Sequence, residues 1–311
     1  MTSYIIEHRS AEPCWSPDGK SIVFSNHEHY GIYIIDVSGN NKRFIVTGES
    51  PKWTSDSQQI IYRWAGKICR VDLNSDKSFT VFESEKGDIA EIALSHDSKR
   101  VAFIEADSKS DTAALCISNV TGSDFKCLTE VRGHLHLRRI SWSPDSHWLV
   151  CGTPDGITVF NVRTGEKQII SHGGEPSWCP TNSIIAYVIR EDFFSSSCLL
   201  LYDFKDQKSS SVRLPESWFA IHQIRKQLTW SPNGQFLAFQ QVKSGGKINR
   251  GRQHNCSICV LRLNDKKIIP LLEGLEESTS RPTWSPDSSK LAACLAGNDE
   301  YYLHVVDVIN R

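Results

Sequence analysis

The chain has 311 residues, of which 39% are hydrophobic and 23% charged, and its formal net charge is −1 at pH 7. This balance argues against a general nucleic-acid binder and against a protein held on acidic membranes, because both need a basic surface. No apolar run approaches the roughly 18 residues of a membrane-spanning helix, and the N-terminus lacks the basic start and long apolar stretch of a secretory signal. We therefore expect a soluble, cytoplasmic protein without a membrane partner.

A turn motif recurs along the chain, first as Trp-Ser-Pro-Asp-Gly at residues 15–19. Its seven copies begin at Trp15, Trp53, Leu94, Trp142, Trp178, Trp230 and Trp284. Proline presets φ, aspartate or asparagine can bond its own backbone, and glycine tolerates positive φ, so each copy indicates a tight turn. The mean spacing, about 44 residues, is typical of one four-stranded blade of a β-propeller.

Each turn joins two predicted strands, because an aromatic residue ends one strand and an apolar, β-rich run begins directly after the turn. Two further runs usually follow, which gives four strands per unit. The last unit supplies only three, near Thr283, residues 291–294 and residues 303–308. The segment at residues 3–6, before the first motif, has the length and pattern of the missing strand.

We predict an all-β fold in which residues 1–311 form a single seven-bladed β-propeller with four-stranded blades. The N-terminal strand, at about residues 3–7, is expected to complete the seventh blade and so to join the two ends of the chain. Closure of this kind removes exposed sheet edges, which otherwise template aggregation.

The motif resembles that of the TolB-type propeller repeats, often called PD40, whose signature is an aromatic-Ser-Pro-Asp-Gly turn between the first two strands of a blade. The resemblance covers essentially the whole chain. The true WD40 pattern fits less well, because no Trp-Asp dipeptide occurs. The same repeat builds the propellers of prolyl-oligopeptidase-like peptidases and of metal-dependent oligogalacturonate lyases, but a shared blade does not transfer an activity.

The ten cysteines favour neither a disulfide framework nor a zinc site. Most lie in predicted strands, where cysteine acts as a small buried hydrophobe; these are Cys69, Cys116, Cys127, Cys151, Cys198, Cys259 and Cys294. The single Cys-x-x-Cys pair, Cys256 and Cys259, would point to opposite faces of one strand. We therefore expect free thiols in a reducing compartment.

The phase of the repeat indicates which residues share a face of the propeller. The top face is defined here as the one that carries the loops between blades and the loops between the second and third strands; the Trp-headed turns then lie on the bottom. The position three residues before each Trp or Leu is expected to ring the top mouth of the central channel. These channel-mouth residues are Glu12, Ser50, Glu91, Arg139, Glu175, Gln227 and Arg281.

Histidines concentrate in the predicted top loops. Eight of the eleven fall there or at the loop edges: His8, His27, His29, His134, His136, His172, His222 and His254. Imidazole is the commonest metal ligand and a natural acid or base near neutral pH. One hypothesis is a divalent cation held by His134, His136, His172 and Glu175; the alternative is a solvated rim that binds a partner.

Three predicted top loops are longer than their counterparts, and such loops often carry function. One displays Phe193 and Phe194, and a second displays Trp218, Phe219 and His222. The third is glycine-rich and basic, and its charged residues are Lys247, Arg250 and Arg252. Exposed aromatic residues beside a charged rim are typical anchors of protein interfaces.

Two functions follow from these features. The first, which we favour, is a non-catalytic scaffold that binds a protein or peptide on the top face and needs no cofactor. The alternative is a metal-dependent lyase or hydrolase that acts on an anionic small molecule at the channel mouth, with a divalent cation and with Arg139 or Arg281 holding the substrate charge. A serine hydrolase is disfavoured, since no Gly-x-Ser-x-Gly motif occurs.

Overall fold

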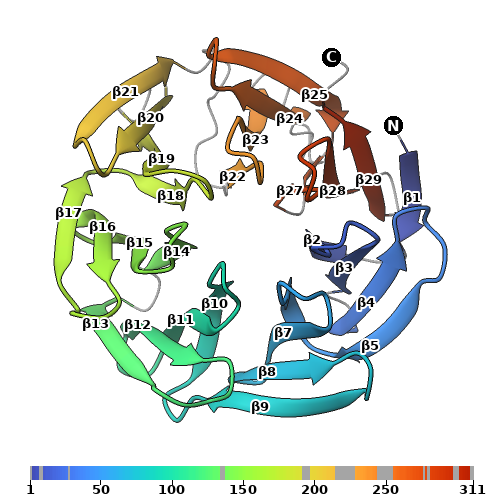
Figure 1. The fold of residues 1–311 in the computed structure, drawn as a ribbon, viewed down its shortest axis with the longest axis horizontal. Helices are drawn as coiled ribbons and strands as arrows, with labels where there is room; N and C mark the ends of the chain where they lie inside the picture. Colours follow the sequence, from blue (N-terminus) through green and yellow to red (C-terminus); the bar gives the residue numbers. More distant parts are fainter. Residues whose placement is uncertain are drawn as a thin grey trace.

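The structure is a computed structural model that describes residues 2–6, 10–26, 29–133, 137–190, 197–213, 228–243, 255–275, 277–278, 281–296 and 301–308. Seven β-sheets stand around a central opening, like the blades of a propeller (Figure 1). The described residues form strands and turns but no helix. A membrane-spanning helix is therefore absent from this part of the chain. The predicted all-β, seven-bladed propeller is confirmed.

Six blades each take four consecutive strands, ordered from the channel outward. Blades 1 and 2 are β2 (Ser10–Trp15), β3 (Ser21–Asn26), β4 (Gly31–Asp36) and β5 (Arg43–Thr47), then β6 (Glu49–Trp53), β7 (Gln59–Trp64), β8 (Lys67–Asp72) and β9 (Lys77–Glu83). Blades 3 and 4 are β10 (Asp88–Leu94), β11 (Arg100–Asp107), β12 (Thr112–Asn119) and β13 (Lys126–Arg132), then β14 (Arg138–Trp142), β15 (Trp148–Thr153), β16 (Gly156–Asn161) and β17 (Lys167–Ser171). Blades 5 and 6 are β18 (Gly174–Trp178), β19 (Ile184–Arg190), β20 (Ser197–Asp203) and β21 (Lys208–Arg213), then β22 (Thr229–Trp230), β23 (Phe236–Lys243), β24 (Asn255–Arg262) and β25 (Lys267–Leu275).

The seventh blade joins the two ends of the chain. Its strands β28 (Lys290–Ala296) and β29 (Tyr301–Asp307) pair with each other, and β1 (Thr2–Ile6) pairs antiparallel with the outer side of β29. Two short strands, β26 (Glu277–Ser278) and β27 (Thr283–Trp284), both pair with β28 on the channel side. The N-terminal strand β1 is therefore the outermost strand of the seventh blade, and its pairing with β29 closes the ring.

The hydrophobic core lies between neighbouring blades rather than at the centre of the disc. Between blades 2 and 3, for example, Ile61 packs with Val101 and Phe103, and each of these side chains is completely buried. The middle strands read as almost continuous apolar runs because both of their faces are covered in this way. The outermost strands are largely exposed.

The repeated motif folds into the same hydrogen-bonded turn in blade after blade. In the first copy the hydroxyl of Ser16 donates to Oδ1 of Asp18 at 2.6 Å, and the backbone N–H of Ser21 donates to the Ser16 hydroxyl at 2.9 Å. The hydroxyls of Ser95 and Ser231 make the equivalent bonds in later copies. The motif thus satisfies its own polar groups and fixes the hairpin between the first two strands.

In four blades the motif tryptophan also bonds to the blade before it. The indole Nε1 of Trp53 donates to the carbonyl of Cys14 at 3.1 Å, and Nε1 of Trp142 donates to the carbonyl of Ala93 at 3.0 Å. In each pair the acceptor directly precedes the residue that heads the previous motif. The same bond joins Trp230 to Ser177 and Trp284 to Thr229.

Further hydrogen bonds join neighbouring turns directly. The backbone N–H of Asp18 donates to the Ser57 hydroxyl of the next turn at 3.1 Å, and the N–H of Ser55 donates to that of Ser98 at 2.8 Å. The motif was interpreted from sequence only as a turn, but it is equally a junction between blades.

One prediction about the cysteines is wrong. Nine described cysteines are free thiols, and most are buried or half-buried, but Cys127 is exposed. It lies on the outermost strand of its blade, where no further strand covers it. The remaining cysteine, Cys256, has a side chain outside the described part of the structure.

The indole bonds between blades can be tested with two tryptophans that head equivalent motifs. Trp142→Phe removes the donor to the carbonyl of the half-buried Ala93, whereas the Nε1 of Trp178 is buried without an acceptor among the described residues. We expect Trp142→Phe to lower the free energy of unfolding by about 1–2 kcal/mol more than Trp178→Phe does. Urea unfolding at equilibrium measures both, and equal losses would contradict the assignment.

Candidate functional site

The innermost strands carry β-bulges at the predicted channel-mouth positions. Pairing between the first two strands shifts register at these positions in blades 1, 2, 4 and 5, and one residue earlier, at Ala90, in blade 3. Four of these residues have left-handed backbone angles: Glu12 (φ 55°), Ser50 (54°), Arg139 (58°) and Glu175 (57°). A left-handed residue other than glycine costs about 1 kcal/mol or more, and a bulge re-aims the side chain it carries. The bulges are therefore locally unfavourable, and they change the direction in which these side chains point.

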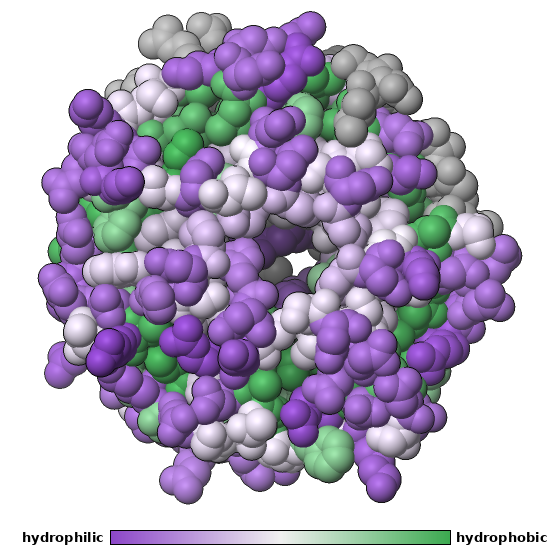
Figure 2. Space-filling model, viewed as in Figure 1, coloured by the Kyte–Doolittle hydropathy of each residue, from purple (hydrophilic) through white to green (hydrophobic). Residues whose placement is uncertain are grey.

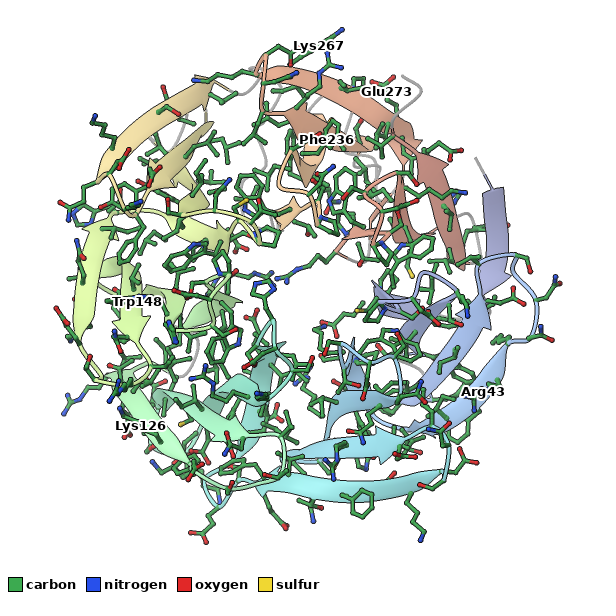
Figure 3. All side chains as sticks on the ribbon, in the orientation of Figure 1. Arg43, Lys126, Trp148, Phe236, Lys267 and Glu273 are labelled. Atoms are coloured by element: carbon green, nitrogen blue, oxygen red, sulfur yellow. The ribbon has the colours of Figure 1, made fainter. Side chains whose placement is uncertain are left out.

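These side chains lie along a cavity of about 470 Å³ in the central channel. Six of the seven predicted residues line it: Glu12, Ser50, Glu91, Arg139, Glu175 and Arg281. The seventh, Gln227, lies outside the described residues. The space-filling view shows the opening at the centre of the disc with hydrophilic side chains beside it (Figure 2), and the stick view shows side chains reaching into it from the innermost strands (Figure 3).

Arg139 ties three consecutive blades together at this cavity. Its Nε lies 2.6 Å from Oε2 of Glu175 in blade 5, and its backbone N–H donates to Oε2 of Glu91 in blade 3 at 2.9 Å. Its guanidinium also approaches Oε1 of Glu91, at 3.9 Å. Only about a fifth of each of these side chains is exposed, so the ion pairs are screened less than surface pairs are.

Arg281 reaches the same carboxylate from the far side of the channel. It belongs to blade 7, yet its Nη2 lies 3.8 Å from Oε1 of Glu91 in blade 3. Desolvation by the channel wall, and then the positive charge of Arg139, lower the pKa of the Arg281 guanidinium, and Glu91, Glu12 and Glu175 offset these effects only in part. Two guanidinium groups therefore share Glu91, and Arg281 is the more loosely held.

Blades 1 and 2 add a second charged group. Arg63 on β7 donates from Nε to the Ser50 hydroxyl at 3.0 Å and pairs through Nη2 with Glu49 at 2.9 Å. Burial raises the pKa of the Glu12 carboxyl, but the charge of Lys52, a hydrogen bond with Ser50 and the charges of Arg63 and Arg281 together lower it below its ordinary value. Glu12 is therefore ionised at neutral pH.

The cavity wall as described carries more positive than negative groups. Its basic side chains are Lys52, Arg63, Arg138, Arg139 and Arg281, and its carboxylates are Glu12, Glu91 and Glu175. An excess of basic groups in a concave, partly desolvated site favours an anionic ligand. Of the basic residues, Arg63 was missed in the sequence; a charged residue inside the apolar run of β7 was the available signal for it.

The residues proposed for a metal do not form a site in the described part of the structure. Glu175 is engaged by Arg139, His172 is exposed, and His134 and His136 lie outside the described residues. No group of three or more His, Cys, Asp or Glu side chains among the described residues is placed to hold a metal ion. The described donors alone therefore do not fit a divalent cation.

The residues proposed for the top-face binding surface cannot be compared with the structure. They all lie outside the described residues: Phe193, Phe194, Trp218, Phe219, His222, Lys247, Arg250 and Arg252. Of the remaining loop histidines, His29 is described and exposed.

Comparison with protein families matches one part of the chain. The family described as WD domain, G-beta repeat matches residues 125–159, which include strands β13 to β15 and most of β16. This stretch contains Gly133-His134 and no Trp-Asp dipeptide, so it carries one of the two dipeptides typical of that repeat. No curated protein sequence matches the chain.

Solved structures with the same fold are distant in sequence. An oligogalacturonate lyase in complex with manganese is 12% identical, with a TM-score of 0.76 over 97% of this chain and 90% of that one. A putative TolB from Agrobacterium tumefaciens is 15% identical, with a TM-score of 0.57 over 89% and 98%. A chain of the Mitotic Checkpoint Complex is 14% identical, with a TM-score of 0.65 over 98% and 89%. These likenesses, with the repeat match, confirm the expected resemblance to TolB-like and WD40-like propellers in fold.

Removal of Arg139 tests whether the ion pairs at the cavity hold the blades. Arg139→Met leaves Glu175 without its partner in a partly desolvated site, so we expect a loss of about 2–3 kcal/mol in the free energy of unfolding. Adding Glu175→Gln should recover part of that loss. The control is Arg262→Met, which breaks an exposed pair with Asp265 and should change little. If the double variant is no more stable than Arg139→Met, the pairing does not carry the effect.

The lowered pKa of Glu12 predicts a specific pH dependence. Folding favours the ionised form, so the contribution of Glu12 is fully present above its ordinary pKa of about 4.3 and is lost as the pH falls through the lowered folded-state pKa. Wild type should exceed Glu12→Gln in stability at pH 6, and this difference should shrink as the pH falls below the ordinary value. Urea unfolding at several pH values measures it; a difference that is constant with pH would contradict the assignment.

Proposed function

We propose that this chain, a WD40-like and TolB-like β-propeller in fold, is a non-catalytic binding protein whose channel mouth receives an acidic group of a protein or peptide partner. The observation that carries the proposal is the pair of guanidinium groups, Arg139 and Arg281, that share the single carboxylate of Glu91. An additional carboxylate at this point would relieve their mutual repulsion and gain charge-assisted hydrogen bonds.

Arg281 is the residue best suited to meet the incoming group. Its contact with Glu91 is 3.8 Å long, and 36% of its side chain is exposed. The arginine can therefore turn to a ligand without breaking a tight ion pair, whereas Arg139 is held at 2.6 Å by Glu175. In this proposal Arg139 sets the local positive charge and Arg281 supplies the adaptable contact.

The top-face loops would give the partner its remaining contacts. Their sequences offer aromatic anchors at Phe193, Phe194, Trp218 and Phe219, and positive charge at Lys247, Arg250 and Arg252, with His222 beside them. Aromatic and arginine residues carry much of the binding energy at protein interfaces. A propeller of similar fold occurs in the Mitotic Checkpoint Complex, a protein assembly, which supports this type of use.

The chemistry of the described carboxylates supports binding rather than catalysis. A general base needs a pKa near the working pH. Glu12 has a lowered pKa, and Glu91 and Glu175 are both engaged by Arg139. We also propose a cytoplasmic location, because the nine described cysteines are free thiols, as is usual in reducing compartments.

A metal-dependent lyase or hydrolase acting on an anionic small molecule is the second candidate. It is favoured by the similar fold of an oligogalacturonate lyase solved with manganese. Such a site would use His134, His136 and His172 as ligands. Glu175 would also have to leave Arg139 and bind the cation instead. The channel arginines would serve an anionic substrate equally well, so an experiment must separate the two functions.

Selection from a random peptide library displayed on phage tests the proposed function. We expect the selected peptides to be enriched in Asp, Glu or a free C-terminal carboxylate. Arg281→Gln should weaken binding of a selected peptide at least tenfold, which corresponds to about 1.4 kcal/mol, because it removes the cation that meets the acidic group. Arg262→Gln, on an outer turn and paired with Asp265, should leave the affinity unchanged.

Two results would contradict the proposal. One is a set of selected peptides without acidic enrichment whose binding does not respond to Arg281→Gln. The other is near-stoichiometric metal in untagged protein, lost in His134→Ala or His172→Ala, together with cleavage of an oligogalacturonate. That second result would establish the lyase instead.

A further inference from the structure

Two cysteines face each other across the outer strands of blade 3. Cys116 on β12 and Cys127 on β13 are directly opposite partners in the antiparallel pairing. The register shifts beside this pair, so that Leu128 is the extra residue of a bulge. Directly opposed residues share one face of the sheet, and each thiol is the largest influence on the pKa of the other.

Equivalent positions in other blades show that this pairing is particular to blade 3. The third strands of blades 2 and 6 also carry a cysteine beside the same register shift, but Cys69 lies opposite Thr80 and Cys259 opposite Pro270. A buried cysteine at this position is thus a repeated packing residue. Among the described blades, only blade 3 places a second thiol opposite it.

The two thiols differ in access to solvent. Cys127 is exposed on the outermost strand, whereas Cys116 is 1% exposed and packs in the core between blades 2 and 3. The labelled side chain of Lys126, next to Cys127 in the chain, lies at the outer edge of the propeller (Figure 3). A dissolved oxidant can therefore reach Cys127 first, and Cys116 is held behind it as the second thiol.

The charges around the pair favour reaction at Cys127. The hydrogen bond from Cys116 lowers the pKa of Cys127 to about 7, opposed by burial and by the charge of Glu130 and assisted by Lys86. The pKa of Cys116 is raised by the same hydrogen bond, by burial, and by the charges of Cys127 and Glu105. The charge of Lys86 offsets this rise only in part. Cys127 therefore ionises more readily than Cys116, which keeps its proton. A thiolate is the reactive form of cysteine.

We propose that Cys127 and Cys116 form a reversible disulfide between β13 and β12 when the protein meets hydrogen peroxide. The Cys127 thiolate attacks one peroxide oxygen, the O–O bond breaks, and the other oxygen leaves as hydroxide and takes up a proton to form water. The Cys116 sulfur then attacks the resulting sulfenic acid. The S–S bond forms, the S–O bond breaks, and hydroxide leaves with the Cys116 proton as a second water. Two thiols are oxidised and one peroxide is reduced.

Peptide mapping of the full-length, reduced protein after peroxide treatment tests the proposal. The remaining thiols are alkylated in denaturant before digestion. We expect a peptide pair joined through Cys116 and Cys127, a fall in intact mass of about 2 Da, and reversal by dithiothreitol. Cys69→Ser, the matched change in blade 2, should keep the cross-link, and Cys127→Ser should abolish it. Recovery of Cys127 as sulfinic acid with Cys116 still alkylated would overturn the proposal.

The pH dependence of Cys127 alkylation by iodoacetamide gives a readout that does not depend on oxidation. The rate in wild type should rise with a midpoint near pH 7. In Cys116→Ala the hydrogen bond to the thiolate is gone, so the midpoint should move toward that of an ordinary cysteine, about 8.5. A midpoint that is the same in both proteins would show that the thiols do not interact and would overturn the pairing.

Discussion

The packing of each blade against its neighbours is the constraint on which the rest of the structure depends, and a hydrogen bond from a motif indole reinforces it at four junctions. A propeller blade buries its faces only against other blades, so the molecule holds together through its junctions. The bonds from Trp53, Trp142, Trp230 and Trp284 each fix the innermost strand of one blade to that of its neighbour. Because the same motif ends the innermost strand of each blade, the described residues three positions before it come to equivalent places around the channel.

At the channel mouth, the repeated blade geometry places charged side chains around a cavity rather than apolar side chains in a core. Bulges with left-handed backbone at Glu12, Ser50, Arg139 and Glu175 are locally unfavourable, and they recur at one position of the repeat. They bring arginines and glutamates from distant parts of the chain to one cavity. Arg139 is well paired with Glu175, yet the cavity wall as a whole carries more basic groups than carboxylates. These two features support a binding site that is preorganised before its ligand binds.

The sequence predicted the fold well because its turn motif is both periodic and physically specific. Counting the turns gives the number of blades, and counting back three residues from each gives, among the described residues, six that line one cavity. The spacing could not reveal that Arg281 spans the channel to Glu91, since this contact depends on side-chain length and ring diameter. It also could not reveal the exposure of Cys127, because apolar neighbours do not show that a strand is outermost. The role of the motif at the blade junctions was missed because the two partners of each bond lie in different repeats, and a pattern within one repeat does not show which residues of two repeats meet.

The most direct test of the account is to observe the channel arginines while an anion binds. Arginine Nε–H resonances of uniformly labelled protein, with that of Arg281 assigned by its loss in Arg281→Gln, would be followed during titration with glutarate and with its diamide. The account predicts saturable shifts of the Arg281 and Arg139 resonances with glutarate, none with the diamide, and no shift of Arg262. An Arg281 resonance that stays fixed throughout the glutarate titration would contradict the claim that the channel mouth is a site for acidic groups.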